Sequence, residues 1–254
     1  MGRSGRPFPY RLHTRSQTSR HTDRSAGSIR RYRYSGSLKS SAPLRTLLGA
    51  VARLPDQARL IHLGTLHEYG PTKAGQAVRP GARPYPANAY ARTKLAGSEA
   101  VLRATGSGMV NASVLRLANV CGPYPSPASF PGLLLRVFRD AAAGRSASLS
   151  IADARRDFVD VRDVAAAVVA AGDRAQARGQ VMNIGSGRVM AITDLVALMA
   201  EVSGVPRRRV TERGVPAAGL GGTWSLADIG AAERLLGWRP TIPLRDSLRD
   251  MWET

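Results

Sequence analysis

Short apolar runs alternate along most of the chain with segments in which apolar residues recur at helical spacing. Continuous runs of this length predict buried strands, and a recurrence near 3.6 residues predicts helices that bury one face. Buried strands are expected at residues 58–64 and 112–120, the edge of a strand at 156–161 and a short strand at 179–187. Helices are expected at residues 44–54, 89–102, 130–144, 162–175, 191–204, 231–238 and 243–254. Strands that alternate with helices are typical of a parallel sheet covered on both faces, so we predict the α/β class.

The first 42 residues lack both periodicities. They are rich in Arg and Ser and poor in aliphatic side chains, a composition typical of disordered segments. The segment has neither the amphipathic stripe of an organelle transit peptide nor the apolar core of a secretory signal. We therefore expect a disordered segment at 1–42 and a folded part from Pro43 onward.

The charge of the chain is concentrated in this first segment. Residues 1–42 hold ten Lys and Arg against one acidic residue, a net charge of +9, and the other 212 residues carry the rest of the +19. A basic arm can bind nucleic acid, and such binding would weaken steeply with salt. Solvated tails are the more common outcome for this composition, so nucleic acid is not the favoured partner.

Several classes of protein are excluded by what the sequence lacks. A single cysteine, Cys121, excludes an internal disulfide, and no Cys/His cluster has metal-ligand spacing, so no metal is expected. No apolar run reaches the roughly 18 residues of a membrane span. A cytoplasmic enzyme without a membrane partner is the resulting expectation.

Tyr90 and Lys94 stand four positions apart in a predicted helix, in a chain where only three of the 37 basic residues are Lys. Residues four apart lie on one helix face, so the phenol and the ammonium can reach the same small volume. A nearby cation favours the phenolate, and lysine supplies a compact charge with rotatable donors. The pair therefore indicates proton transfer. In isolation, such a pair is more often two side chains on a solvated helix face.

Six segments, in order and spacing, resemble the extended short-chain dehydrogenase/reductase family in its NAD-dependent epimerase/dehydratase branch, which acts on nucleotide sugars. They lie between about Leu44 and Trp252 and read RLIHLGTLHEYG, YARTK, LRLANVCGPYPSP, RRDFVDVRDVAAA, VMNIGSG and AERLLGWRP. The resemblance implies a Rossmann-like, doubly wound parallel sheet that lacks its first strands, with a smaller C-terminal α/β substrate-binding part. We expect the rest of the cofactor domain at 43–150 and the mainly substrate-binding part at 151–254, interleaved with the first.

The resemblance also implies three catalytic residues. Thr65 lies four positions before Tyr69 and 25 before Tyr90, as the family's catalytic Ser or Thr does. It would hydrogen-bond the substrate oxygen that changes oxidation state, and Tyr90 would give or take the proton of that oxygen. Lys94 would favour the Tyr90 phenolate and bind the ribose of the nicotinamide, so Tyr90 and Lys94 are also the expected contacts of an NAD or NADP cofactor.

Two further residues match substrate-binding positions of the family. Asn119 would contact the nucleotide sugar, and the forked guanidinium of Arg156 would bind its diphosphate. Thr65 would alternatively be a buried strand threonine and Arg156 one surface arginine among many. Cys121 is expected to be a small buried residue rather than a nucleophile, and no role is expected for His67 or Glu68.

The segments HLGTLHEYGP and ANVCGPYPSPASFPGLLL look most like the 4-ketoreductases that reduce a dTDP-4-keto-6-deoxyhexose with NAD(P)H. The same Thr, Tyr and Lys set serves nucleotide-sugar epimerases and dehydratases, and a non-catalytic sugar-nucleotide-binding protein is a third possibility. The expected partner is a dTDP-sugar or another nucleotide sugar. A homodimer is expected from the resemblance, through the helix that carries Tyr90 and its neighbour.

One element of the family pattern is missing from the sequence. The family opens with a strand and a Gly-x-x-Gly-x-x-Gly turn, whose backbone approaches the cofactor pyrophosphate at a helix N-terminus. Gly2 and Gly5 have the first spacing but neither the preceding strand nor the following apolar helix. Our hypothesis is that residues 1 to about 42 come from a shifted reading frame or a misassigned start, which puts cofactor binding and turnover in question.

Overall fold

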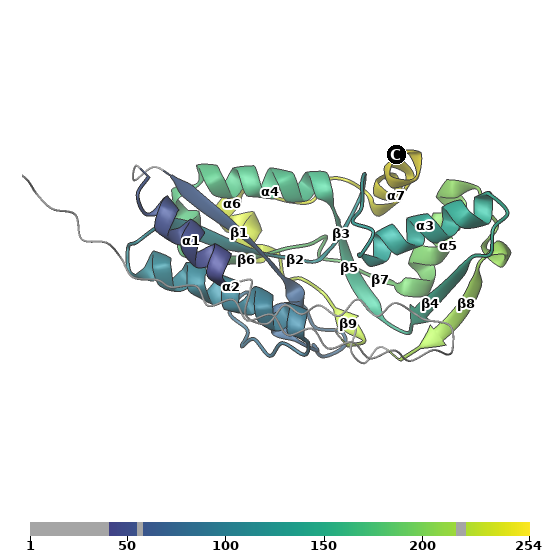
Figure 1. Ribbon diagram of the computed structural model, residues 1–254, viewed down its shortest axis with the longest axis horizontal. Coiled ribbons are helices and arrows are strands. Elements are labelled where there is room, and N and C mark those ends of the chain that lie inside the picture. Colours follow the sequence, from purple (N-terminus) through teal and green to yellow (C-terminus); the bar gives the residue numbers. More distant parts are fainter. Residues whose placement is uncertain (1–40, 55–57, 217–221) are drawn as a thin grey trace, which may run out of the picture. The chain divides into compact units, whose positions relative to one another are not determined.

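The computed structural model describes residues 41–54, 58–216 and 222–254, with side chains from Pro43 onward. The disorder predicted for residues 1–42 therefore falls outside the described residues for 1–40, and it is wrong for Ser41 and Ala42, which begin a helix. Figure 1 shows the arrangement of the described elements and gives their labels.

A three-stranded parallel sheet is built from the apolar runs that the sequence predicts as buried strands. Its order is β1-β2-β6, with β1 at Arg59–Thr65, β2 at Asn111–Leu117 and β6 at Val181–Ile184. Leu60 lies opposite Ala112, and Val114 lies opposite Val181. All three strands run in the same direction, so their carboxyl ends meet at one edge of the sheet.

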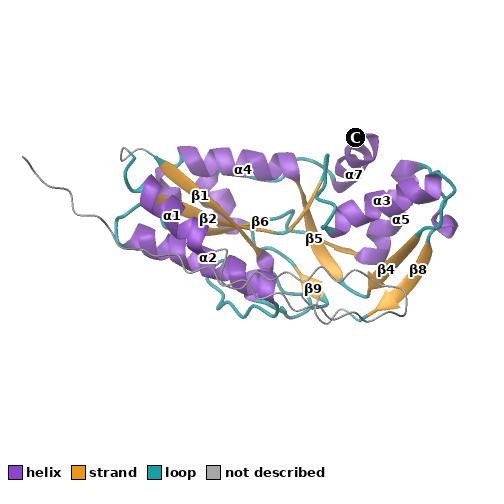
Figure 2. Cartoon of the chain, viewed as in Figure 1, coloured by secondary structure: helices purple, strands orange, loops and turns teal. Residues whose placement is uncertain are grey.

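Helices cover both faces of this sheet. They are α1 (Ser41–Val51), α2 (Ala89–Gly106), α4 (Val161–Asp173) and α6 (Gly230–Leu236). Successive side chains of β2 point to opposite faces of the sheet. Val114 belongs to the same hydrophobic cluster as Val101 of α2, and Leu115 belongs to the same cluster as Ala167 of α4. Figure 2 shows α2 and α4 on opposite sides of the strands. The predicted doubly wound α/β class is confirmed.

The described fold also contains six further strands and three further α-helices. The strands are β3 (Asn119–Cys121), β4 (Ser148–Ala152), β5 (Arg155–Asp160), β7 (Val189–Ala191), β8 (Thr211–Val215) and β9 (Trp224–Ser225). The helices are α3 (Phe130–Ala142), α5 (Ile192–Ser203) and α7 (Leu244–Glu253). Their shared core contains Phe138, Leu149, Leu195 and Leu248, which expose at most 1% of their surface. The strand β5 pairs with β3, β7 and β9, whereas β4 pairs with β8.

Several sequence-based expectations are corrected by the structure. The predicted strand at 112–120 is two strands, because the chain leaves β6 at Ala118, whose N–H donates to the carbonyl of Ile184, and Asn119 then pairs with β5. The sheet that contains β5 is mixed rather than parallel, since β7 runs antiparallel to β5. The pair β4 and β8 was not predicted. The helix predicted at 44–54 ends at Val51, so Leu54 lies beyond it and is 53% exposed.

Two short connections matter most for the site. A 3-10 turn, η1 (Leu66–Tyr69), follows β1 directly, and a Gly- and Pro-containing loop at 122–129 follows β3. Both begin at the carboxyl ends of strands, where open α/β sheets bind their ligands. The division of the chain near residue 150 into two functional parts stays a prediction.

Candidate active site

A cavity of about 850 Å³ lies where β1 and β2 end, and its wall continues through β3 and the loop that follows. All five residues predicted from the sequence line this cavity: Thr65, Tyr90, Lys94, Asn119 and Arg156. They come from four separate elements, namely β1, α2, β3 and β5. The structure therefore brings the complete predicted set together in one place.

Thr65 is held at the junction of β1 and η1. It is 6% exposed, and its hydroxyl oxygen accepts a hydrogen bond from the His67 N–H at 3.3 Å. This contact makes Thr65 the N-cap of η1, and the carboxylate of Glu68 completes the reciprocal capping box by accepting the Thr65 N–H. The threonine is thus buried, as the alternative interpretation expects, and it also lines the cavity, as a catalytic role requires.

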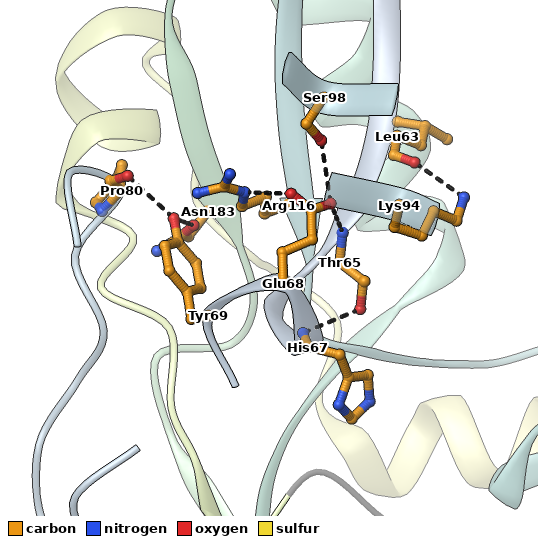
Figure 3. A network of polar contacts seen from close by, with 10 residues as sticks. All are labelled: Leu63, Thr65, His67, Glu68, Tyr69, Pro80, Lys94, Ser98, Arg116 and Asn183. Atoms are coloured by element: carbon orange, nitrogen blue, oxygen red, sulfur yellow. Dashed lines mark hydrogen bonds and ion pairs between the residues drawn. The ribbon is translucent and has the colours of Figure 1, made fainter. Parts of the chain in front are cut away.

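Tyr90 and Lys94 lie in the first turns of α2. The helix begins after Asn88, whose side chain accepts the Ala91 N–H at 2.9 Å. Tyr90 is 45% exposed, and the Lys94 ammonium donates to the carbonyl of Leu63 at 3.1 Å (Figure 3). The same helix face therefore presents a phenol and an ammonium to the cavity, beside the end of β1.

Asn119 and Arg156 form the wall on the β5 side. The amide of Asn119 donates to the carbonyl of Asp157 at 2.9 Å, which ties β3 to β5. Arg156 is only 5% exposed, and its guanidinium donates to the carbonyls of Arg155 and Gly222. Burial lowers the pKa of Arg156, yet an arginine stays protonated at neutral pH. The reading of Arg156 as one of many surface arginines is wrong, whereas its role as a diphosphate ligand stays a prediction.

His67 is a further titratable residue of the cavity wall. Its imidazole lies edge-on to the Tyr90 ring, with 6.5 Å between ring centroids and 72° between the ring planes. Burial lowers the pKa of His67, and the positive charge of Arg156 lowers it further. Since the ordinary pKa of His is about 6.5, the imidazole is neutral at neutral pH. No role was expected for this residue from the sequence.

A buried ion pair beneath Thr65 was also missed from the sequence. Glu68 is 0% exposed and Arg116 is 4% exposed, and the Arg116 Nε donates to the Glu68 carboxylate at 2.7 Å. The two residues are 48 positions apart, so no local pattern pairs them. One signal was available, because Arg116 is the only charged residue in the predicted strand at 112–120, and a charge inside a buried strand needs a partner.

Cys121 lines the cavity without the properties of a nucleophile. Burial raises the pKa of its thiol to about 11, so the thiolate is scarce at neutral pH. In the described ranges, no group of three or more His, Cys, Asp or Glu side chains could hold a metal ion. No helix of the described residues combines the length and apolarity needed to cross a membrane.

The fold and this arrangement define a class of protein: a Rossmann-like α/β protein with a Tyr and Lys pair at the carboxyl edge of its parallel sheet. The sequence pattern of the NAD dependent epimerase/dehydratase family matches residues 42–185. The chain belongs to this family, within the extended short-chain dehydrogenases/reductases.

Two members of the family are similar to this chain over much of its length. A dTDP-6-deoxy-L-talose 4-dehydrogenase (NAD(P)(+)) of Kitasatospora kifunensis is 40% identical over 211 residues, which cover 81% of this chain and 65% of that protein. A dTDP-L-rhamnose 4-epimerase of Burkholderia thailandensis is 33% identical over 175 residues, which cover 66% of this chain and 46% of that protein. The chain thus spans less than two thirds of the length of either relative.

Solved structures have the same fold. The UDP-glucuronic acid 4-epimerase of Bacillus cereus, in complex with UDP-glucuronic acid and NAD, has a TM-score of 0.73 at 26% identity and covers 84% of this chain and 66% of its own. The RMD protein of Pseudomonas aeruginosa, complexed with NADPH, has a TM-score of 0.69 at 23% identity and covers 78% of this chain and 66% of its own. Nicotinamide cofactors are therefore bound by proteins of this fold, in both the NAD and the NADP form.

Proposed function

We propose that the chain carries the reaction site of a nucleotide-sugar oxidoreductase, which interconverts the 4-keto and 4-hydroxyl forms of a dTDP-6-deoxyhexose with NAD(P). One observation carries the proposal: Thr65, Tyr90, Lys94, Asn119 and Arg156 all line a single cavity of about 850 Å³. That volume lies within the roughly 300–1,000 Å³ typical of small-molecule sites.

The similarity to a dTDP-6-deoxy-L-talose 4-dehydrogenase supports a dTDP-linked deoxyhexose as the substrate. That name describes the oxidation of a 4-hydroxyl group, and the reverse reaction is the reduction of a 4-ketone. The same side chains serve both directions, because a group that takes a proton in one direction gives it back in the other. We propose that this chain catalyses the reduction of the 4-ketone.

The proposed chemistry assigns one task to each catalytic side chain. The Thr65 hydroxyl donates a hydrogen bond to the substrate oxygen, and the Tyr90 phenol gives a proton to that oxygen during reduction. Lys94 places a positive charge on the same helix face and stabilises the phenolate that Tyr90 becomes. NAD(P)H, when bound, would supply the hydride that the substrate carbon receives. Proton transfer by a positioned side chain of this kind contributes roughly 10²- to 10⁴-fold to a rate.

The residues fit the nicotinamide end of the cofactor better than its pyrophosphate end. The Lys94 ammonium has three N–H donors and donates one of them to the carbonyl of Leu63. The other donors can bind the hydroxyl groups of a ribose. The 254 residues contain no Gly-x-x-Gly-x-x-Gly turn, which is the feature that holds a pyrophosphate in the family pattern. A protein that binds the sugar nucleotide without turnover is the second candidate function.

Two ligand titrations separate these candidates. Purified protein is titrated with NADPH and with NADH, followed by the fluorescence of the nicotinamide, and with a dTDP-6-deoxyhexose, followed by calorimetry. Saturable binding of both ligand types supports the oxidoreductase, and sugar-nucleotide binding alone supports the non-catalytic candidate. If dTDP-6-deoxyhexose does not bind to the wild type, both proposals are wrong.

A nucleotide-sugar epimerase remains the alternative within the same chemistry. Epimerisation at a carbinol carbon uses the same Thr, Tyr and Lys set, and a dTDP-L-rhamnose 4-epimerase is among the similar proteins. Product analysis distinguishes the reactions, because an epimerase inverts the 4-hydroxyl group without net consumption of cofactor. A reductase consumes one NAD(P)H for each hydroxyl formed.

A further inference from the structure

Glu68 is a fully buried carboxylate at the centre of the polar contacts beneath the cavity. Its Oε1 accepts the Thr65 N–H at 3.0 Å and the Ser98 hydroxyl at 3.1 Å, and its Oε2 accepts the Arg116 Nε at 2.7 Å. Figure 3 shows the carboxylate between these three groups. One side chain therefore joins the end of β1, the helix α2 and the strand β2.

The first of these contacts acts on Thr65. Glu68 holds the backbone of Thr65, while the Thr65 hydroxyl oxygen accepts the His67 N–H. A threonine hydroxyl has one proton to donate and two lone pairs to accept with. Because η1 uses the hydroxyl only as an acceptor, its proton can be donated to a ligand oxygen in the cavity.

The second contact acts on the helix that carries Tyr90 and Lys94. Ser98 follows Lys94 by four positions and Tyr90 by eight, so all three side chains share one face of α2. Ser98 is 0% exposed, and its hydroxyl meets the same Glu68 oxygen that holds Thr65. Glu68 thereby ties the face of the helix that bears Tyr90 and Lys94 to the turn that bears Thr65.

The close approach of the carboxylate depends on Gly64. A Cβ at this position would collide with Glu68 Oε1 and would lie 3.1 Å from the Ser98 hydroxyl. The residue before Thr65 therefore has to be glycine for the carboxylate to reach both partners.

Arg116 is the counterion that permits a carboxylate to be buried here. Its guanidinium also lies over the Tyr69 ring, 4.4 Å from the centroid, and the Tyr69 hydroxyl donates to Asn183 Oδ1 at 2.9 Å. The contacts thus continue from α2 to β6. Separation of Glu68 from Arg116 would leave an unpaired buried charge, which is strongly destabilising. The ion pair and its hydrogen bonds therefore keep a fixed geometry.

We propose that Glu68 is a positioning residue that sets the placement of Thr65 relative to Tyr90 and Lys94. The inference rests on the proposed function, since it assigns Glu68 an effect on the proposed reaction through residues that contact the substrate. Glu68 itself lies beneath the site and is not among the residues that line the cavity.

Two substitutions test this role, and each removes a different interaction of the Glu68 carboxylate. Ser98→Ala removes the contact with α2 and leaves the ion pair intact, and Glu68→Gln removes the charge but keeps an oxygen acceptor. Both variants are expected to lower kcat about 10-fold or more, because small displacements of reacting groups are costly. The affinity for dTDP alone, measured by calorimetry, is expected to stay within about twofold, because the proposed diphosphate contact is Arg156.

A matched control separates positioning from lost stability. Asp163 is 4% exposed, and its carboxylate accepts the Thr241 N–H, the Thr241 hydroxyl and the Ile242 N–H at 3.0–3.1 Å, away from the cavity. Asp163→Asn should lower Tm and leave kcat within about twofold of the wild type. Unchanged kcat in Ser98→Ala and Glu68→Gln, or an equal loss of kcat in Asp163→Asn, would overturn the proposal.

The inference and the proposed function can fail separately. If the wild type binds a dTDP-6-deoxyhexose without turning it over, the proposed reaction is wrong. The role of Glu68 is then decided by the ratio of the affinities for dTDP-6-deoxyhexose and for dTDP. A lower ratio in Ser98→Ala, with the ratio of Asp163→Asn unchanged, supports positioning of Thr65, and an unchanged ratio in Ser98→Ala contradicts it.

Discussion

Arg156 and Cys121 show how burial changes the meaning of a single residue. The sequence contains 37 basic residues, and nothing in its pattern separates Arg156 from the rest except the resemblance to a family. The structure separates it physically, because its guanidinium is 5% exposed and lines the cavity. Arg156→Lys should weaken the binding of dTDP about 10-fold, because lysine lacks the planar guanidinium that forms bidentate hydrogen bonds with a diphosphate. Calorimetry with dTDP measures this, and Arg155→Lys, at an exposed neighbouring position, is the control.

Cys121 lies in the wall of the same cavity but is expected to be inert. Its surface is 2% exposed, and burial raises the pKa of the thiol to about 11. A thiol-specific reagent should therefore react slowly with the native protein at neutral pH and rapidly after unfolding in urea. Rapid reaction of the native protein would show that the thiol is accessible and ionised, which would contradict the burial of Cys121.

At the scale of single elements, the start of α2 matters most, because its first turns carry Tyr90 and Lys94. Asn88 is the N-cap of this helix, and its side-chain oxygen accepts the Ala91 N–H at 2.9 Å. Asn88→Ala should lower the free energy of unfolding by about 0.5–2 kcal/mol, whereas Asn88→Ser, which keeps a capping oxygen, should be nearly neutral. Urea unfolding of both variants measures the difference, and equal stability of the two would contradict the capping role.

The elements also show what periodicity can and cannot predict. Short apolar runs correctly predict the strands β1, β2 and β6. The burial predicted for β1 is wrong for most of its length, because β1 is the edge strand of the described sheet and Leu63 is 38% exposed. The pair β4 and β8 was missed because β8 is almost entirely exposed and its residues, TERGV, carry no apolar alternation. The pairing of Glu68 with Arg116 was missed because it joins the turn η1 to the strand β2 across 48 positions of sequence, and no local pattern predicts such a contact.

At the scale of the whole molecule, two histidines make the stability depend on pH. Burial lowers the pKa of both His62 and His67 below the ordinary value of about 6.5. Lys94 lowers the pKa of His62 further, and the buried His62 Nε2 has no hydrogen-bond partner within the described residues. The two imidazoles therefore bind protons at a higher pH in the unfolded chain than in the folded protein. The free energy of unfolding should be highest above about pH 6.5 and should fall as the pH drops below that value.

This dependence can be measured by urea unfolding at about pH 7.5 and about pH 5.5. The wild type should lose stability at the lower pH, and the double variant His62→Gln/His67→Gln should lose less. An equal loss in both proteins would assign the acid sensitivity to other groups.

Assembly is a further property of the whole molecule. The family resemblance predicts a homodimer through the helix that carries Tyr90 and its neighbour. Light scattering of the purified protein should give twice the mass of one chain if this prediction holds, and a single-chain mass would contradict it.

The most direct test of the account is the oxidation of NADPH or NADH in the presence of a dTDP-4-keto-6-deoxyhexose, compared between the wild type and Tyr90→Phe. The wild type should consume cofactor only when the sugar nucleotide is present. Tyr90→Phe should bind the sugar nucleotide normally but lose about 10²- to 10⁴-fold in rate. Turnover that is unaffected by the loss of the Tyr90 hydroxyl would contradict the assignment of the site, and sugar-nucleotide binding without any turnover would leave a binding protein in place of the proposed enzyme.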